Sequence, residues 1–164
     1  MDRVRKLKPR REACPSCNAG QLVARDVERT RHVAGHVFAA TLPARVCAAC
    51  DTEFFDDATV STFDNLVAAR LADAGVKDGE ALKFMRKGTG LNGKEFAELL
   101  EVRAETVSRW EQAKRPIDRA TYALMRQLVL DRVHGTTATA DYLRSLHRPR
   151  RLPKRVKIDL HDAA

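Results

Sequence analysis

The spacing of the four cysteines limits the possible folds of this chain more than any other feature. They form two Cys-x-x-Cys pairs, Cys14 with Cys17 and Cys47 with Cys50, and 29 residues lie between the pairs. Two residues between thiols let a tight turn aim both sulfurs at one point, and two such turns supply four soft ligands with tetrahedral geometry. We therefore expect one structural Zn²⁺ bound by all four thiolates, with no open position for catalysis.

Two other roles of the four cysteines, disulfide bonding and redox catalysis, agree less well with their spacing than metal binding does. Disulfides are disfavoured in a reducing compartment, and a thioredoxin-like redox site needs a single pair in a βαβ context. Asn18 and Asp51 follow the second cysteine of each pair, and these residue types tolerate the positive φ of such turns. His32 and His36 flank Gly35, so we expect them to be exposed on a hairpin and not to bind metal.

Residues 14–57 are accordingly predicted to form a small zinc ribbon. Val27, Val33 and Val37 are scattered among polar residues, which indicates two or more short strands with Gly35 at a turn. Four thiolates and one Zn²⁺ together lower the formal charge of the chain from +8 to about +6. The surface of this domain is therefore better suited to a protein partner than to nucleic acid.

The remainder is expected to be helical, which gives an α+β fold class with a zinc ribbon followed by an all-α helix-turn-helix domain. Residues 58–79 are assigned to a connecting helix and linker. The helix is predicted from Thr59 to Ala74, ends at Gly75, and has one apolar stripe. The members of this stripe are Phe63, Leu66, Val67 and Leu71.

Residues 80–134 carry the pattern of a helix-turn-helix and dimerisation domain. One helix starts near Ala81, and a second is capped by Asn92, with Glu95 completing a capping box. A turn at 101–103 leads to a short helix over residues 104–112. Pro116 and Asp118 then begin a helix with more apolar residues than one small domain can bury, so we assign these residues to the core and to a dimer contact. These residues are Tyr122, Leu124, Met125, Leu128, Val129 and Val133.

The helix over residues 104–112 has two different faces. Val107 and Trp110 lie three residues apart and are expected to face inward. The opposite stripe presents side chains that suit base edges in the major groove of double-stranded DNA: Glu105, Ser108, Arg109 and Gln112. The candidate phosphate contacts are Lys94, Arg103, Thr106, Lys114 and Arg115. The alternative is a helical bundle whose outer stripe is only solvated.

Charge and composition narrow the class of protein. The formal charge is +8, and residues 1–13 and 135–164 each carry +4. Such a balance is typical of nucleic-acid binding, although simple solubility would also explain it. We find neither a membrane span nor a secretion signal, and expect a cytoplasmic protein that associates with the nucleoid when bound to DNA. No arrangement of catalytic residues is evident, so we do not expect an enzyme.

The segments CPSC and CAAC followed by LNGKEFAELLEVRAETVSRWEQAKRPI resemble the YgiT/MqsA-type family, a zinc ribbon fused to an Xre-type (lambda-repressor-like) helix-turn-helix. The resemblance covers residues 14 to about 130. It implies a homodimer formed through the C-terminal domain, a palindromic operator, and often the role of antitoxin and repressor of its own operon. It also implies a ribonuclease toxin bound through the zinc domain.

Three positions depart from the family pattern. Glu105 and Arg109 match positions that read bases in the family. The family usually has Asn at the position of Glu105, so we expect this operator to differ from the usual one, with Glu105 accepting from cytosine N4. Glu101 stands where many such turns have Gly, at a cost of about 1 kcal/mol. Arg103 replaces the customary Ser cap.

Both ends of the chain are basic. Residues 1–13 form a basic N-terminal segment, and residues 135–164 a basic tail that we expect to be flexible. The part from Leu146 to Lys157 suits either an arm along DNA phosphates or a solvated end.

The alternatives to an antitoxin are a stand-alone Xre-type regulator and a protein-interaction adaptor with a degenerate helix-turn-helix.

Overall fold

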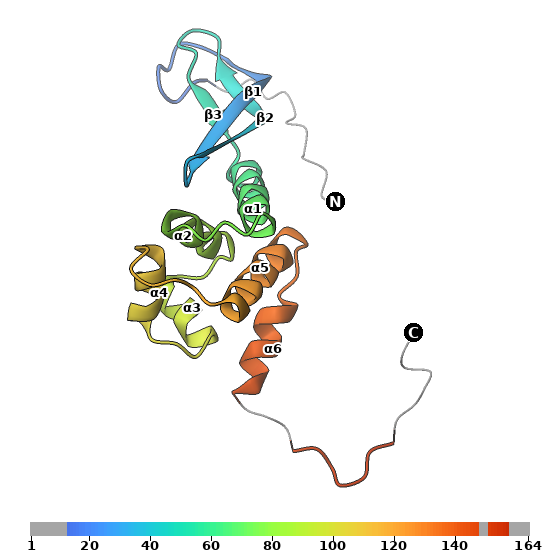
Figure 1. The fold of residues 1–164 in the computed structure, drawn as a ribbon. Coiled ribbons are helices and arrows are strands. Elements are labelled where there is room, and N and C mark those ends of the chain that lie inside the picture. The colour runs from blue at the N-terminus through green and yellow to red at the C-terminus, as the bar shows by residue number, and fades with distance from the viewer. Residues whose placement is uncertain (1–12, 148–150, 158–164) are drawn as a thin grey trace.

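The structure is a computed structural model that describes residues 13–147 and 151–157. Its first part is an antiparallel sheet of three strands in the order β1 (Leu22–Val33), β2 (His36–Cys47) and β3 (Glu53–Phe55) (Figure 1). Both β1 and β2 have 12 residues, so they are longer than the short strands expected from the sequence. The sequence pattern did not show this length, because polar residues lie on both faces of β1, for example Arg25 and Asp26, and break the alternation typical of a half-buried strand.

The turn between β1 and β2 is formed by Ala34 and Gly35, at φ values of 51° and 76°. Two successive residues with positive φ define the type I′ turn, whose twist matches that of the strands it joins. The expected turn at Gly35 is therefore present, and His32 and His36 lie on the strands beside it, both exposed as predicted.

Helices occupy the rest of the described fold (Figure 1). They are α1 (Asp57–Asp73), α2 (Gly79–Gly88), α3 (Gly93–Leu99), α4 (Ala104–Glu111), α5 (Arg119–Val133) and α6 (Ala138–Leu146). The prediction of a mixed α+β chain is thus confirmed. In the described residues, no helix has the length and apolar character needed to cross a bilayer.

Side-chain caps define where several helices begin. Asn92 Oδ1 accepts from the backbone N–H of Glu95 at 2.9 Å, and Glu95 Oε2 accepts from the N–H of Asn92 at 2.8 Å, which confirms the expected capping box at α3. Asp78 caps α2 and Asp118 caps α5 in the same way, through the N–H groups two and three residues later. These local bonds satisfy amides that no helix turn can satisfy.

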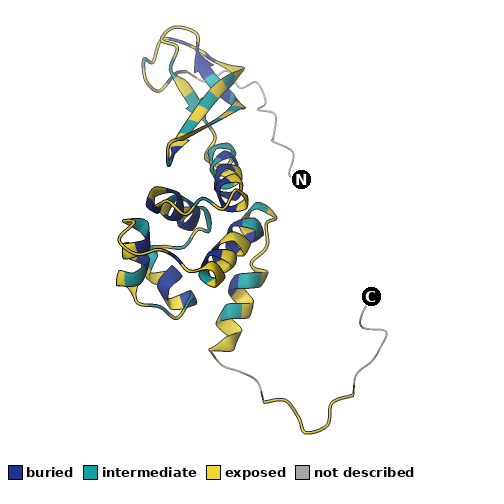
Figure 2. Ribbon diagram, viewed as in Figure 1, coloured by how far each residue is buried: buried dark blue, intermediate teal, exposed yellow. Residues whose placement is uncertain are grey.

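The buried core lies among α1, α2 and α5 and extends to α3 and α4 (Figure 2). Its fully buried members include Leu71, Leu82, Met85 and Phe96. Helix α1 packs against both α2 and α5, so it belongs to this core instead of being only a connection. Leu66 was expected on the buried face of α1, but its side chain is 50% exposed. The face of α1 that packs on the other helices carries Ala68, Ala69 and Ala72 instead.

The turn end of the hairpin is fastened to the helices. Val33 and Leu42 are buried in the same core. Arg31 donates two hydrogen bonds of 2.8 Å to the carboxylate of Asp64 on α1, and the N–H of Ala34 donates to Glu80 Oε2 on α2 at 2.9 Å. The sheet region and the helices therefore share apolar and polar contacts.

The apolar residues of α5 are mostly satisfied within the chain. Tyr122, Met125, Leu128 and Val129 are buried, and only Leu124 among the expected contact residues is exposed, at 36%. The prediction that these residues contribute to the core is therefore confirmed for most of them, because α1 and α2 cover them. The dimer contact expected in addition stays a prediction.

Helix α6 corrects the expectation of a flexible tail from residue 135 onward. Asp131 on α5 accepts from the N–H of Thr139 at 2.7 Å, and Ala140 is buried against the core. Residues 151–157 are exposed and contain no helix or strand. The basic segment 1–13, apart from Ala13, and residues 148–150 and 158–164 lie outside the described residues.

Candidate metal centre and nucleic-acid interface

The four cysteines come together although 29 residues separate the two pairs. The Sγ atoms of Cys14 and Cys50 are 3.8 Å apart, those of Cys17 and Cys47 are 3.6 Å apart, and all four lie within 4.8 Å of one another. The thiols are free, so no disulfide competes for them. Among the described residues, this is the one group of three or more such side chains that could hold a metal ion.

Each pair is held by the same local geometry. The N–H of Asn18 donates to the carbonyl of Cys14 at 2.8 Å, and the N–H of Asp51 donates to that of Cys47 at 3.0 Å. Asn18 and Asp51 have φ values of 57° and 54°, as expected for residues that turn the chain back after the second cysteine. This repeated turn aims the two thiols of each pair at a common point.

Hydrogen bonds favour the thiolate form of Cys17 and Cys50, two members of the cluster. The N–H groups of Ala19 and Gly20 lower the pKa of Cys17 to about 6 from its ordinary 9.0. The hydroxyl of Thr52, 3.1 Å from Cys50 Sγ, lowers the pKa of Cys50. The pKa of Cys47 is instead raised to about 11, because the N–H of Ala49, which lowers it, is outweighed by burial and by the neighbouring thiols of Cys50 and Cys17. The thiolate is the form that ligates a metal, so the polar environment of Cys17 and Cys50 suits a cation bound by sulfur.

Gly20 leaves the space that the cluster needs. A Cβ atom at this position would lie 2.3 Å from Cys47 Sγ and 2.8 Å from the Cβ of Ala49. The two turns approach each other so closely that only glycine fits between them. Sequence reasoning missed this residue, although a glycine three positions after Cys17 was a visible signal.

Helix α4 separates its two faces as expected. Val107 is 2% exposed and Trp110 is 4% exposed, which confirms that both face the core. The side chains of the opposite stripe, Glu105, Ser108, Arg109 and Gln112, are all exposed. Gln112 lies just beyond the end of α4, and its Nε2 donates to Ser108 Oγ at 2.9 Å. The structure thus presents the four polar residues together on one surface.

The turn between α3 and α4 contains the two residues that differ from the usual helix-turn-helix pattern, Glu101 and Arg103. Glu101 has a φ of 53°, in the left-handed region that favours glycine. Arg103 is the residue before α4, and no side chain caps this helix. The turn is closed by the N–H of Val102, which donates to the carbonyl of Ala97 at 3.0 Å.

The candidate phosphate contacts lie near the ends of α3 and α4. Lys94 is in the first turn of α3 and forms an exposed pair with Glu98 at 3.8 Å. Arg103, Lys114 and Arg115 are exposed at the two ends of α4, whereas Thr106 is half-buried. Cations at both ends of the polar stripe suit a long polyanion that passes over it.

Two residues that hold α4 in place were missed by sequence reasoning. Arg86 on α2 pairs with Glu111, the last residue of α4. A Cβ atom at Gly79 would lie 2.6 Å from the carbonyl oxygen of Glu111, so α2 begins in close contact with the end of α4. Spacing along the sequence does not show such long-range contacts.

Comparison with known proteins adds no assignment to these sites. None of the models of known protein families matches the chain, and none of the curated proteins compared with it matches either. The function of the chain must therefore be inferred from two features of its structure. One is the cluster of four free cysteines, and the other is α4, which has one buried and one polar face and packs against α2 and α3.

Proposed function

We propose that this chain is a sequence-specific DNA-binding repressor in which α3 and α4 form a helix-turn-helix and α4 enters the major groove. One observation carries the proposal: α4 buries Val107 and Trp110 and exposes Glu105, Ser108, Arg109 and Gln112 together. A helix that buries one face and exposes forked, hydrogen-bonding side chains on the other has the geometry used to read base edges.

The side chains have distinct roles in this proposal. Arg109 pairs with guanine O6 and N7, and Glu105 accepts from cytosine N4. Ser108 and Gln112, which share a hydrogen bond, supply further contacts to bases. Lys94, Arg103, Thr106, Lys114 and Arg115 contact phosphates and fix the position of the chain on the duplex.

The bound metal in this proposal is one structural Zn²⁺. A tetrahedron with Zn–S bonds of about 2.3 Å has sulfurs about 3.8 Å apart. Two Sγ–Sγ separations of the cluster, 3.6 and 3.8 Å, agree with this, and all four Sγ atoms lie within 4.8 Å of one another. Cys14, Cys17, Cys47 and Cys50 would fill every position, so the ion stabilises the fold and does not act in catalysis. The sheet region is in these terms a zinc ribbon.

The wider role rests on the resemblance to the YgiT/MqsA-type family. In this role the chain is a homodimer on a palindromic operator, and an antitoxin whose zinc ribbon binds a ribonuclease toxin. The charge supports this division, because residues 14–79 are net acidic whereas residues 80–134 are net basic. Such a protein acts in the cytoplasm, at the nucleoid.

Selection from a pool of random DNA duplexes tests the proposal although the operator sequence is unknown. The full chain, loaded with zinc, should enrich a two-fold symmetric sequence containing guanine and cytosine at the positions that Arg109 and Glu105 face. An unenriched pool, even at low salt, would overturn it and favour the adaptor with a degenerate helix-turn-helix. Enrichment without any co-purifying toxin from the native host favours the stand-alone regulator.

A further inference from the structure

Strand β1 is an open edge of the sheet. The strand order β1-β2-β3 leaves one side of β1 without a neighbouring strand among the described elements. The carbonyl of Gln21 accepts from the N–H of Ala48 at 3.0 Å, and backbone groups alternate in direction along an antiparallel strand. The odd-numbered residues of β1 therefore direct their N–H and C=O groups at β2, whereas the even-numbered residues direct theirs at the open side. Such an edge is a template for pairing with another segment.

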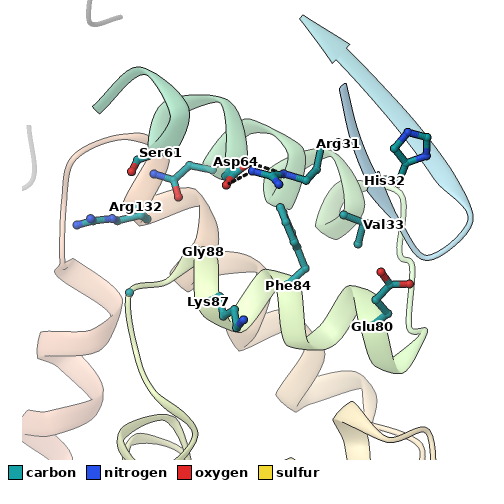
Figure 3. A pocket seen from close by; sticks show the side chains of 12 residues that line it. Arg31, His32, Val33, Ser61, Asp64, Glu80, Phe84, Lys87, Gly88 and Arg132 are labelled. Carbon is teal, nitrogen blue, oxygen red and sulfur yellow. Dashed lines mark hydrogen bonds and ion pairs between the residues drawn. The ribbon is translucent and has the colours of Figure 1, made fainter. Parts of the chain in front are cut away.

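The two faces of β1 also differ. Arg31 and Val33 point toward the helices, and His32 between them points away (Figure 3). The even-numbered side chains from residue 24 to residue 32 are all exposed. Two of them are carboxylates, Asp26 and Glu28, and neither forms a hydrogen bond or ion pair with any residue that the structure describes. The exposed face of this edge is therefore acidic.

A single bridge sets the register of the chain that leads into the first cysteine turn. Ala13 pairs with Gln21 in antiparallel fashion, and the N–H of Cys14 donates to the carbonyl of Gly20 at 2.8 Å. In an antiparallel ladder the numbers of paired residues have a constant sum, which is 34 here. Because β2 occupies the other side of β1, a segment that continues this ladder toward the N-terminus lies along the open side.

We propose that residues 6–12, which precede the described part of the chain, form a fourth strand on the open edge of β1. The register then pairs Lys8 with Asp26 and Lys6 with Glu28 on the exposed face. Opposite charges directly across a pair of strands stabilise the pairing. The basic segment and the acidic edge are therefore complementary residue by residue.

Three further residues fit the same register. Pro9 has no N–H, and at this position the group would face solvent, where an edge strand tolerates proline. Leu7 lies opposite the half-buried Val27. Arg5 would meet Arg29, so like charges end the pairing before residue 6. A shift by one residue would turn Pro9 toward β1 and place the lysines on the wrong face.

The fourth strand runs directly into Cys14, so its pairing holds the first cysteine turn against the sheet. It also covers backbone groups that are otherwise open to a strand of another molecule. The pairing does not depend on DNA binding.

Amide hydrogen exchange of the full chain, supplied with zinc and followed by NMR, tests the pairing. The amides of Ala24, Asp26 and Glu28 should be protected to the same extent at low and high protein concentration. Contacts between the Hα protons of Leu7 and Val27 should verify the register, because non-hydrogen-bonded pairs have Cα atoms only about 4.5 Å apart. Unprotected amides or another register would overturn the proposal. Protection that rises with concentration would also overturn it and assign the edge to a second copy.

Two neighbouring arginines allow matched proline variants. Arg10→Pro removes an N–H that faces β1, whereas Arg11→Pro removes the same side chain and an N–H that faces solvent. Exchange of the Ala24 and Asp26 amides should accelerate by at least about tenfold in Arg10→Pro and by less than about twofold in Arg11→Pro. Odd-numbered amides of β1 should stay protected in both, which verifies that the hairpin is retained. Equal effects of the two variants would contradict the proposal.

A charge exchange tests the ionic complementarity. Lys8→Glu places two carboxylates opposite each other and should lower protection of the Glu28 amide by about two- to fivefold. Adding Asp26→Lys to this variant should restore the protection. A further loss in the double variant would show that residues 8 and 26 do not face each other.

Discussion

The guanidinium of Arg86 lies against the carboxylate of Glu111 and ties α2 to the last residue of α4. The side chains are only 9% and 15% exposed, and Arg86 Nη1 also donates to the carbonyl of Leu91 at 2.8 Å. Removing one partner of a buried ion pair leaves the other charge without compensation. This pair therefore fixes how α4 is presented on the surface of the helices.

Replacing Glu111 by Ala should lower the free energy of unfolding by about 3 to 5 kcal/mol, because Arg86 would stay buried without its counter-ion. Glu98→Ala is the matched control. Its pair with Lys94 is exposed at 68% and 81%, and such pairs contribute less than about 1 kcal/mol. Urea unfolding measures both, and losses of similar size would show that burial does not decide the strength of the Arg86 pair.

Gly20→Ala should destroy metal binding. The added methyl group would overlap Cys47 Sγ, so the two cysteine turns must separate and zinc content at equilibrium should fall by at least about tenfold. Gly93→Ala adds the same group at a position with no neighbour within 4 Å and serves as control. Zinc per chain after dialysis against a weak chelator is the measurement. Full zinc retention by Gly20→Ala would contradict the close approach of the turns.

Ala113→Gly should stabilise the chain by up to about 1 kcal/mol, because Ala113 has a φ of 55° at the end of α4, where glycine avoids strain. Ala123→Gly, an exposed position inside α5, should instead destabilise by about 1 kcal/mol. The two changes are chemically identical, so thermal unfolding reports only the backbone conformation. The same sign for both would show that the left-handed turn is not under strain.

Acid should weaken the attachment of α6. Burial alone would raise the pKa of Asp131, but the N–H of Thr139 and the amide of Gln127 donate to its carboxylate and lower the pKa below the ordinary 3.8. A lowered folded-state pKa means that this stabilisation is complete above pH 3.8 and is lost as the pH falls through the folded-state value.

Asp131→Asn keeps an acceptor for Thr139 but removes the charge. Its unfolding free energy should therefore be lower than that of the wild type at neutral pH, and the difference should shrink as the pH falls below about 4. Urea unfolding at a series of pH values gives this difference. A gap that stays constant down to about pH 2 would mean that the Asp131 carboxylate has no lowered pKa.

Local chemistry explains which features were predictable. The capping box of Asn92 and Glu95 and the left-handed residues Asn18 and Asp51 depend on neighbours within a few positions, so the sequence shows them directly. The inward face of α4 follows from helical periodicity and the large apolar area of Trp110. The two turns orient the cysteines, and the cap of α3 and the inward face of α4 orient the polar stripe, so both candidate sites could be predicted.

Features that depend on distant contacts could not be predicted. Helix α6 is short, and its start is stabilised by Asp131 of α5, which accepts from the N–H of Thr139, while Ala140 packs on the core. The role of α1 in the core depends on its contact with α5, which lies far along the chain. The hairpin reaches the helices through Val33 and Leu42, and no local pattern reports that contact.

The most direct test of the central proposal compares wild type, Arg109→Ala and Lys83→Ala on a selected duplex and on its scrambled version, by fluorescence anisotropy at fixed salt. Wild type and Lys83→Ala should prefer the selected duplex by at least about 10³-fold. Arg109→Ala should lose about 1 to 3 kcal/mol on the selected duplex and much less on the scrambled one. Equal binding of both duplexes by the wild type, or full preference retained by Arg109→Ala, would contradict the account.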